Sequence, residues 1–264
     1  MAMIYSMVDV APTVSTVLGV RTPAGAQGAP ISEILRDLSE ATRVAVLAPD
    51  AFGWFAWTLW QHEMPYLQSL HAEHSLILRS VMPSITPVNF ATMVTGTDLD
   101  GHGVRTRDHD FQCQTLFDVV RRAGGQSAAV GFEGYTGSTL LARYADIDGT
   151  TERGSDDLIV EKVLEIARSE GPEFVIAQLG RVDDVFHEFG PSSPEVVPML
   201  RDTDARLRRL VKALRPLGYG AIILADHGQH DIAAEDRSDG DATPKRGGHG
   251  QDRDEDRLVP CTWL

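Results

Sequence analysis

The sequence predicts an α/β protein: one three-layer α/β/α domain over residues 1–264 with a mostly parallel central sheet. Short runs rich in aliphatic side chains recur along the chain, at 44–48, 75–79, 127–132, 174–178, 221–225 and 258–263. Segments with helical periodicity lie between several of these runs, and alternation of strand and helix favours parallel strands covered by helices. No Pro- or Gly-rich linker divides the chain, so we expect a single domain.

The apolar runs are short and bounded by turn residues, which is typical of strands buried on both faces. Two helices are predicted between them. Ser155 can cap the first, which places Ile159, Val163 and Ile166 on one face and ends at Gly171. The second ends before Gly218 and carries apolar residues at helical spacing, namely Leu200, Leu207, Leu210, Val211 and Leu214.

Charge and composition exclude several classes of function. The 24 Lys and Arg residues against 38 Asp and Glu residues give a net charge of −14, so bulk attraction to nucleic acid or to an anionic membrane is not expected. No apolar run approaches the roughly 20 residues of a membrane-spanning helix. Cys113 and Cys261 are isolated, and the N-terminus has no basic region of a signal peptide, which predicts a cytoplasmic location.

Acidic and imidazole side chains follow three of the predicted strands, where ligands of open α/β sheets bind. Asp50 follows the run at 44–48, and Asp226 and His227 precede a glycine after the run at 221–225. Asp183 and His187 are four residues apart, so a helix would place both on one face. His249 lies in a loop predicted over 235–257.

Each of these groups has an ordinary explanation when taken alone. An exposed Asp–His pair, an Asp-His-Gly turn and a loop histidine are all common. Together they form a carboxylate and imidazole set without thiolates, which suits zinc, manganese or iron. Two sites of such mixed ligation would form a two-metal centre that acts on phosphorus.

At this point the sequence resembles the alkaline phosphatase superfamily. The segment from Thr86 through Asn89 to Gly96, followed by His102-Gly103-Val104, is similar to the nucleophile segment of that superfamily. It is closest to the nucleotide pyrophosphatase/phosphodiesterase branch and is also similar to phosphonoacetate hydrolase. The acidic and histidine motifs above follow in the family's order, and the resemblance covers about residues 44–264.

The resemblance implies a role for each motif residue. Asp50, Asp226 and His227 would hold one divalent ion, zinc by preference with manganese or iron as alternatives, and this ion would also contact Thr86. Asp183, His187 and His249 would hold the second ion. Thr86 would be the nucleophile and Asn89 would donate its amide N–H to a phosphoryl oxygen, although both residues also fit a helix start, with Asn89 as a simple cap.

One departure from the family indicates a circular permutation. A segment beginning Asp9-Val-Ala-Pro-Thr13 and ending near Leu18-Gly19 resembles one that the family carries after its last histidine ligand. Residues 1–43 would then be the family's C-terminal segment moved to the N-terminus. Asp9 is expected to be structural in that case.

The expected reaction is hydrolysis of a phosphodiester or nucleotide pyrophosphate bond in a small phosphate-containing substrate, through a covalent phospho-Thr86 intermediate. A Thr–Asn pair favours this over a monoester, since nothing in the sequence directs Arg105 or Arg107 at the site. A phosphonate C–P hydrolase is the alternative, weakened because the chain has only Lys162, Lys212 and Lys245 to hold a carboxylate. A non-catalytic metal-binding relative is the third possibility.

Aromatic residues gather directly after Asp50. Phe52, Trp54, Trp57 and Trp60 would either stack on a substrate base or belong to the core. The helical spacing of Trp57 and Trp60 favours the core.

Overall fold

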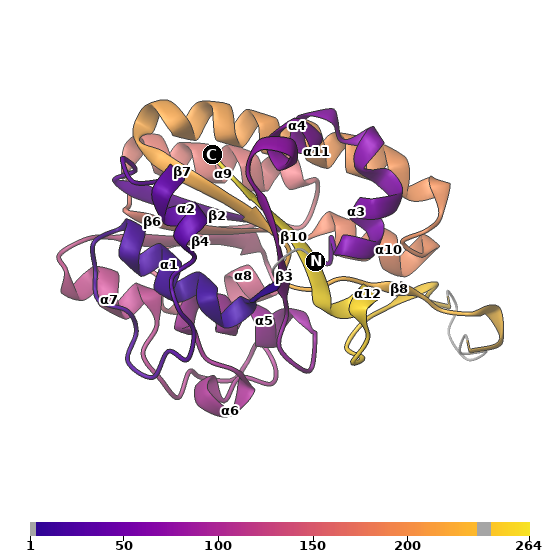
Figure 1. The fold of residues 1–264 in the computed structure, drawn as a ribbon, viewed down its shortest axis with the longest axis horizontal. Helices are drawn as coiled ribbons and strands as arrows, with labels where there is room; N and C mark the ends of the chain where they lie inside the picture. The colour runs from indigo at the N-terminus through magenta and orange to yellow at the C-terminus, as the bar shows by residue number, and fades with distance from the viewer. Residues whose placement is uncertain (1–3, 237–243) are drawn as a thin grey trace.

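The computed structural model describes residues 4–236 and 244–264, and an eight-stranded sheet forms its centre (Figure 1). In spatial order the strands are β1 (Ile4–Ser6), β3 (Ser75–Arg79), β10 (Leu258–Trp263), β7 (Tyr219–Leu224), β2 (Arg43–Pro49), β6 (Phe174–Leu179), β4 (Ser127–Phe132) and β5 (Ile147–Thr151). Only β10 among these runs antiparallel to its neighbours. The predicted mostly parallel sheet is therefore confirmed.

Helices cover both faces of the sheet. Figure 1 shows α4 (Pro65–Glu73), α9 (Asp156–Ser169) and α11 (Val197–Leu214) above it, and α1 (Val10–Val17), α5 (Thr86–Thr95) and α7 (Leu116–Arg122) below it. The remaining α-helices are α2 (Ser32–Asp37), α3 (Trp54–Trp60), α6 (Leu99–His102), α8 (Thr136–Thr139), α10 (Arg181–Phe189) and α12 (Asp254–Arg257). This arrangement is the three-layer architecture predicted from the alternation of strands and helices.

The two helices predicted from their sequence are both present. The Ser155 hydroxyl accepts a hydrogen bond from the Asp157 amide at 3.2 Å, and α9 buries Ile159, Val163 and Ile166. In α11 the five predicted apolar residues are all buried. The capping and periodicity signals therefore located both helices correctly.

The sequence did not predict the edge strands β1 and β5. β1 has three residues, and β5 reads Ile-Asp-Gly-Thr-Thr, which lacks an apolar run. An edge strand has one neighbour and is less buried, so its sequence carries a weak signal. The loop expected over 235–257 contains β9 (Gly247–Gly248), which pairs with β8 (His230–Asp231), and α12; its residues 237–243 lie outside the described residues.

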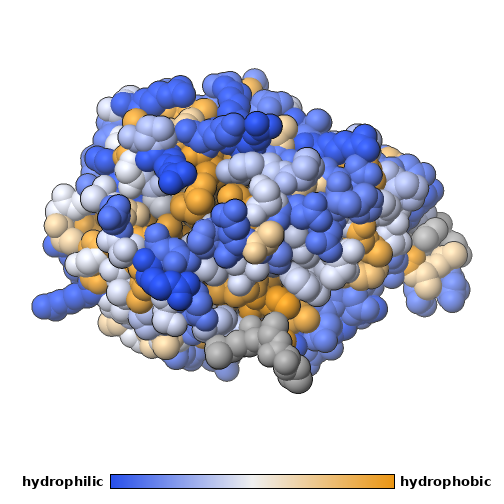
Figure 2. Space-filling model, turned by 45° about the horizontal axis from the view of Figure 1, so that its top comes forward, coloured by the Kyte–Doolittle hydropathy of each residue, from blue (hydrophilic) through white to orange (hydrophobic). Residues whose placement is uncertain are grey.

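The core is continuous through the centre of the sheet. Every residue of β4, β6, β7 and β10 is buried, as expected for strands covered on both faces. Figure 2 shows a largely hydrophilic surface on which apolar residues form separate patches. Among the described residues, no helix is long and apolar enough to cross a membrane. The cytoplasmic location and the single domain stay predictions.

The N-terminal segment is built into the fold. Helix α1 packs against α5, and the Asp9 carboxylate accepts hydrogen bonds from the amides of Ser6 and Ala29, both at 2.9 Å. Asp9 thus ties the start of the chain together. Its contacts are structural, as expected.

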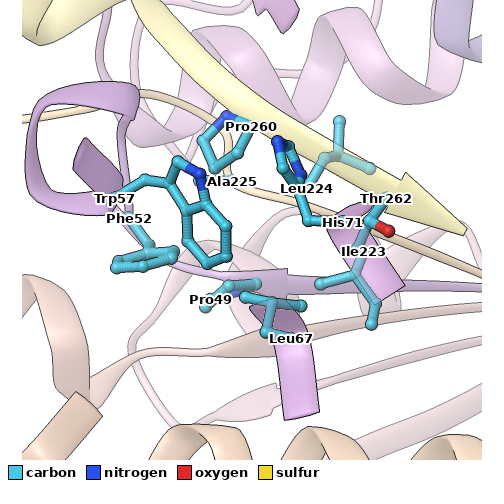
Figure 3. A pocket seen from close by; sticks show the side chains of 10 residues that line it. All are labelled: Pro49, Phe52, Trp57, Leu67, His71, Ile223, Leu224, Ala225, Pro260 and Thr262. Atoms are coloured by element: carbon cyan, nitrogen blue, oxygen red, sulfur yellow. The ribbon is translucent and has the colours of Figure 1, made fainter. Parts of the chain in front are cut away.

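The tryptophans after Asp50 lie on α3. Trp57 is 1% exposed, and its ring centroid lies 6.2 Å from that of Phe52 and 4.7 Å from that of His71. Figure 3 shows Trp57 beside a small apolar cavity of about 10 Å³, between α3, α4 and strand β10. Trp57 is therefore a core residue, as its helical spacing predicts. Trp60 is only half-buried, and its ring N–H donates to the Pro191 carbonyl at 2.8 Å, so the prediction is confirmed for Trp57 alone.

Candidate metal centre

Three adjacent parallel strands bring the predicted ligands to one edge of the sheet. Strand β2 lies between β6 and β7, and all three run in the same direction. Asp50 follows β2, Asp183 and His187 lie on α10 after β6, and Asp226 follows β7. Parallel strands end at the same edge, so the topology gathers side chains that are far apart in the sequence.

The first group consists of Asp50, Asp226 and His227, all buried. One ligand atom from each lies within 4.8 Å of the others. The Nε2 atom of His227 is 3.2 Å from Asp226 Oδ2 and 3.7 Å from Asp50 Oδ1. The same nitrogen is 3.1 Å from the hydroxyl oxygen of Thr86. The structure thus places Thr86 directly against this group.

The second group consists of Asp183, His249 and again His227. Asp183 Oδ1 lies 3.6 Å from His249 Nε2, while Asp183 Oδ2 lies 3.5 Å from His187 Nε2. The rings of His187 and His249 are 5.1 Å apart. Asp183 therefore connects His187 to this group, and His227 is close to both groups, which differs from the expected assignment of three separate ligands to each ion.

The three histidines share one hydrogen-bond arrangement. The Nδ1 atoms of His187, His227 and His249 face the carbonyl oxygens of Gly247, Gly228 and Ser84 at 2.8, 3.0 and 3.3 Å. A carbonyl accepts only, so each Nδ1 carries a proton, and in the neutral ring the lone pair lies on Nε2, where a metal can bind. Such a backbone partner on the second nitrogen is typical of metal-binding histidines.

The electrostatics of the cluster favour a bound cation. Burial, together with the negative charge of Asp226, raises the pKa of Asp50 well above its usual range, and burial also raises the pKa of Asp226. Burial and the neighbouring His227 and His187 lower the pKa of His249 to about 2. Buried carboxylates held this close are destabilising unless a positive charge lies among them.

Two carboxylate oxygens provide a direct test of metal fit. Asp50 Oδ1 and Asp226 Oδ2 are buried and have no hydrogen-bond partner in the described part of the chain. Both oxygens lie close to His227 Nε2, the second nitrogen of that ring. Oxygen and imidazole ligands of this kind fit a zinc-type divalent ion. The residues present therefore suit the implied metal.

Sequence reasoning missed two residues that hold the ligands in place. Gln178, at the end of β6, donates its amide N–H to Asp50 Oδ2 and accepts one from the Gly137 amide. Gln229 donates to Asp183 Oδ1 at 2.6 Å. Both glutamines are 1% exposed. For Gln178 the available signal was a polar residue near the end of a predicted apolar strand, whereas Gln229 lies in the loop after β7 and offered none.

Thr86 is the first residue of α5 and projects from the helix N-terminus, where the backbone favours an anion. Asn89 lies one helical turn after Thr86 on the same helix. Its side chain is fully buried, its oxygen accepts from the Val81 amide at 2.8 Å, and its nitrogen donates to the Val81 carbonyl at 3.2 Å. These contacts fasten the loop before Thr86, and the role expected for Asn89 as a phosphoryl donor stays a prediction.

A cleft of about 520 Å³ opens onto the metal groups. Thr86, Asp50, Asp183 and His187 line one part of it, and the remaining lining includes Arg105 and Arg107. The expectation that neither arginine is directed at the site was therefore wrong. The turn after α6, which the sequence could not place, brings both into the cleft, whereas the tryptophans of α3 are not among its lining residues.

The sheet, the layers and the ligand edge define an alkaline-phosphatase-like α/β protein. More specifically, the chain belongs to the type I phosphodiesterase / nucleotide pyrophosphatase family, whose model matches residues 44–110 and 105–249. The resemblance read from the motifs is confirmed. Divalent metal dependence follows from the family and agrees with the two ligand groups.

Individual relatives are distant. A venom phosphodiesterase of Macrovipera lebetinus is 27% identical over 203 residues, and one of Naja atra is 26% identical over 203 residues. Each match covers 66% of this chain but only 24% of the relative, so the chain spans about a quarter of these curated relatives.

Solved structures share the fold. Murine ectonucleotide pyrophosphatase / phosphodiesterase 5 superposes with a TM-score of 0.66 at 16% identity, over 83% of this chain and 87% of its own. Phosphonoacetate hydrolase from Sinorhizobium meliloti 1021 superposes with a TM-score of 0.57 at 19% identity, over 73% of this chain and 58% of its own.

Proposed function

We propose that this chain is a two-metal hydrolase that cleaves a phosphodiester or nucleotide pyrophosphate bond through a covalent phospho-Thr86 intermediate. One observation carries the proposal: the Thr86 hydroxyl lies 3.1 Å from Nε2 of His227, within the group that also contains Asp50 and Asp226. A threonine needs no such neighbours to begin a helix.

Two divalent ions, zinc by preference, would lower the pKa of a bound hydroxyl and offset the charge that develops around phosphorus. Asp50, Asp226 and His227 would hold one ion, and Asp183, His249 and His187 the other. The Thr86 oxygen loses its proton to solvent and attacks phosphorus. The Thr86 O–P bond forms while the bond to the leaving-group oxygen breaks. Water then attacks phosphorus and releases the Thr86 oxygen.

The surrounding residues prepare this step. Gln178 and Gln229 fix the rotamers of Asp50 and Asp183, so the ligands are positioned before substrate arrives. The Asn89 contacts to Val81 hold the loop that leads into Thr86. The N-terminus of α5 supplies partial positive charge where the phosphoryl group would lie.

The alternative is cleavage of a C–P bond in a small phosphonate. The observation that favours it is the fold shared with phosphonoacetate hydrolase, which was solved with phosphonoformate. The fold shared with the murine protein, whose inactive variant was solved in complex with AMP, favours the nucleotide reading. A small phosphate- or phosphonate-containing molecule is the substrate in both cases. A non-catalytic metal-binding relative is the third reading.

Three substrates distinguish these readings. Zinc- or manganese-loaded protein would be assayed with bis-p-nitrophenyl phosphate, p-nitrophenyl phosphate and phosphonoacetate. The proposal expects faster turnover of the diester than of the monoester and no release of phosphate from phosphonoacetate. Phosphate release from phosphonoacetate alone would establish the C–P hydrolase. Two bound metals without turnover of any substrate would leave the non-catalytic relative.

We further propose that the order of the segments reflects a circular permutation. Strands β1 and β10 flank β3, and Ile4 and Pro260 are both register partners of Ile77. The end of β10 and the start of β1 thus lie at the same end of β3. A chain in which residues 1–43 follow residue 264 through a short linker should fold and bind the same metals. The permutation hypothesis would be wrong if that chain failed to fold while the same linker, inserted in an exposed loop of the original chain, did not prevent folding.

A further inference from the structure

The cleft next to Thr86 has a strongly basic wall. Four cationic side chains line it, from Arg105, Arg107, Arg153 and Lys245. None of the four forms an ion pair with a carboxylate in the ranges 4–236 and 244–264, whereas many of the other basic residues do. In a chain with a net charge of −14, unpaired cations gathered in one cleft call for a specific explanation.

Two of the cations are fastened by backbone. Arg107 donates to the Gly134 carbonyl, and Arg153 donates to the neighbouring Glu133 carbonyl at 2.9 Å. The Arg153 guanidinium also lies 5.3 Å from the centre of the Tyr135 ring. These contacts use part of each guanidinium and leave its other N–H groups available. The turn after β4 therefore presents two arginines together on one wall.

The acidic residues of the cleft do not neutralise this wall. Asp184, the lining carboxylate outside the metal groups, accepts from Arg181 at 2.5 Å and from Tyr135 at 2.7 Å. The remaining lining carboxylates are Asp50 and Asp183. With Asp226, these give three negative charges, and two divalent ions would leave the centre near +1 while the Thr86 hydroxyl keeps its proton. The cations are thus not needed to balance the ligands.

A simple phosphodiester carries one negative charge, which the metal centre alone would balance. We infer that the basic wall binds a second anionic group on the same substrate, a phosphate or a carboxylate adjacent to the phosphorus that Thr86 attacks. The preferred substrate class is then a pyrophosphate or a carboxylate-bearing phosphonate, and not an uncharged diester of one phosphate. This inference rests on the proposed function, which places the attacked phosphorus at Thr86.

Binding of non-hydrolysed probes tests the inference. Zinc-loaded protein would be titrated calorimetrically with methylphosphonate, which has one anionic group, and with methylenediphosphonate and phosphonoformate, which have two. The variant Arg105→Gln/Arg107→Gln removes two cations of the wall. Arg168→Gln is the matched control, since Arg168 is exposed on α9 and outside the cleft.

We expect the two-anion probes to bind wild type at least about tenfold more tightly than methylphosphonate. The double variant should lose most of that difference while its affinity for methylphosphonate changes less than about threefold, and Arg168→Gln should match wild type. Loss of affinity for methylenediphosphonate but not for phosphonoformate would identify the second group as a phosphate. Loss for phosphonoformate but not for methylenediphosphonate would identify it as a carboxylate.

An unchanged preference in the double variant, with zinc content and melting temperature intact, would overturn the inference. So would an equal loss of affinity for all three probes, because the arginines would then contact the attacked phosphoryl group itself. Turnover is not measured, so absence of hydrolysis by the protein would count against the proposed function and not against the basic wall.

Discussion

The hydroxyl oxygen of Thr86 lies 3.1 Å from Nε2 of His227, although the two residues are 141 positions apart. Thr86 begins α5, on one face of the sheet, and His227 follows β7 at its carboxyl edge. The His227 Nδ1 atom lies 3.0 Å from the Gly228 carbonyl and donates its proton to it. In the neutral ring the lone pair is then on Nε2, the nitrogen that faces Thr86. A candidate metal ligand and a candidate nucleophile therefore lie in direct contact, and several consequences can be measured.

Replacement of Asp226 by Asn should stabilise the metal-free protein and weaken its response to zinc. In the absence of metal, Asp226 is a fully buried carboxylate beside Asp50, and the amide removes that cost. We expect the melting temperature in chelator to rise by roughly 2–4 °C and the rise on adding zinc to shrink. Differential scanning calorimetry with and without zinc measures both, with exposed Asp100→Asn as the control. A variant that gains as much from zinc as wild type would contradict the ligand assignment.

Replacement of Gln178 by Leu should weaken zinc binding about 10- to 100-fold, because Asp50 loses the donor that fixes its carboxylate. Competition with a fluorescent chelator measures the affinity. Gln126→Leu, at an exposed position before β4, should leave it unchanged. Equal affinities in the Gln178 variant and wild type would show that Asp50 is held without this contact.

His102 should make the fold sensitive to acid. The side chain is fully buried, accepts from the Val104 amide at 3.0 Å, and burial lowers its pKa from 6.5 to about 4. Between these values the unfolded chain binds the proton and the folded chain does not, so stability is lost as pH falls from 6.5 to 4. The difference corresponds to about 3 kcal/mol.

His102→Asn keeps an acceptor for Val104 but cannot be protonated. Urea unfolding at pH 7 and pH 4.5 should show that wild type loses about 2–3 kcal/mol more than this variant over the interval. If both proteins lost the same free energy of unfolding, His102 would not be a source of acid sensitivity.

Trp57→Ala should destabilise the fold without a specific effect on substrate binding. Removing a buried tryptophan from the cluster with Phe52 and His71 should cost about 3–5 kcal/mol of unfolding free energy. Urea unfolding gives the stability, and KM measured well below the melting temperature should match wild type. A large change in KM with little loss of stability would instead support a base-stacking role.

The sequence predicted the central strands and the long helices because their signals are local. Apolar runs mark β4 and β6, and Ser155 marks the start of α9. The candidate metal ligands could also be listed from the sequence, because the residues that follow parallel strands gather at one edge of the sheet, and the structure brings these residues together. Short edge strands such as β5 carry too few apolar residues to be found this way.

The directions in which individual side chains of the site point could not be predicted from the sequence. Asn89 is one helical turn after Thr86, yet its amide faces the loop at Val81, because the backbone there offers both a donor and an acceptor. Arg107 enters the cleft because the Gly134 carbonyl of a distant turn holds it. Both side-chain positions depend on tertiary contacts with other segments of the chain, and local sequence patterns do not show which segments meet.

The most direct test of the central claim is hydrolysis of bis-p-nitrophenyl phosphate by Thr86→Ala, with bound metal measured on the same sample. Thr106→Ala is the matched control, because Thr106 is an exposed threonine that lines the same cleft. We expect Thr86→Ala to keep two metal ions per chain and to lose at least about 10³-fold in kcat, while Thr106→Ala stays within about tenfold of wild type. Wild-type turnover by a fully metal-loaded Thr86→Ala protein would contradict it.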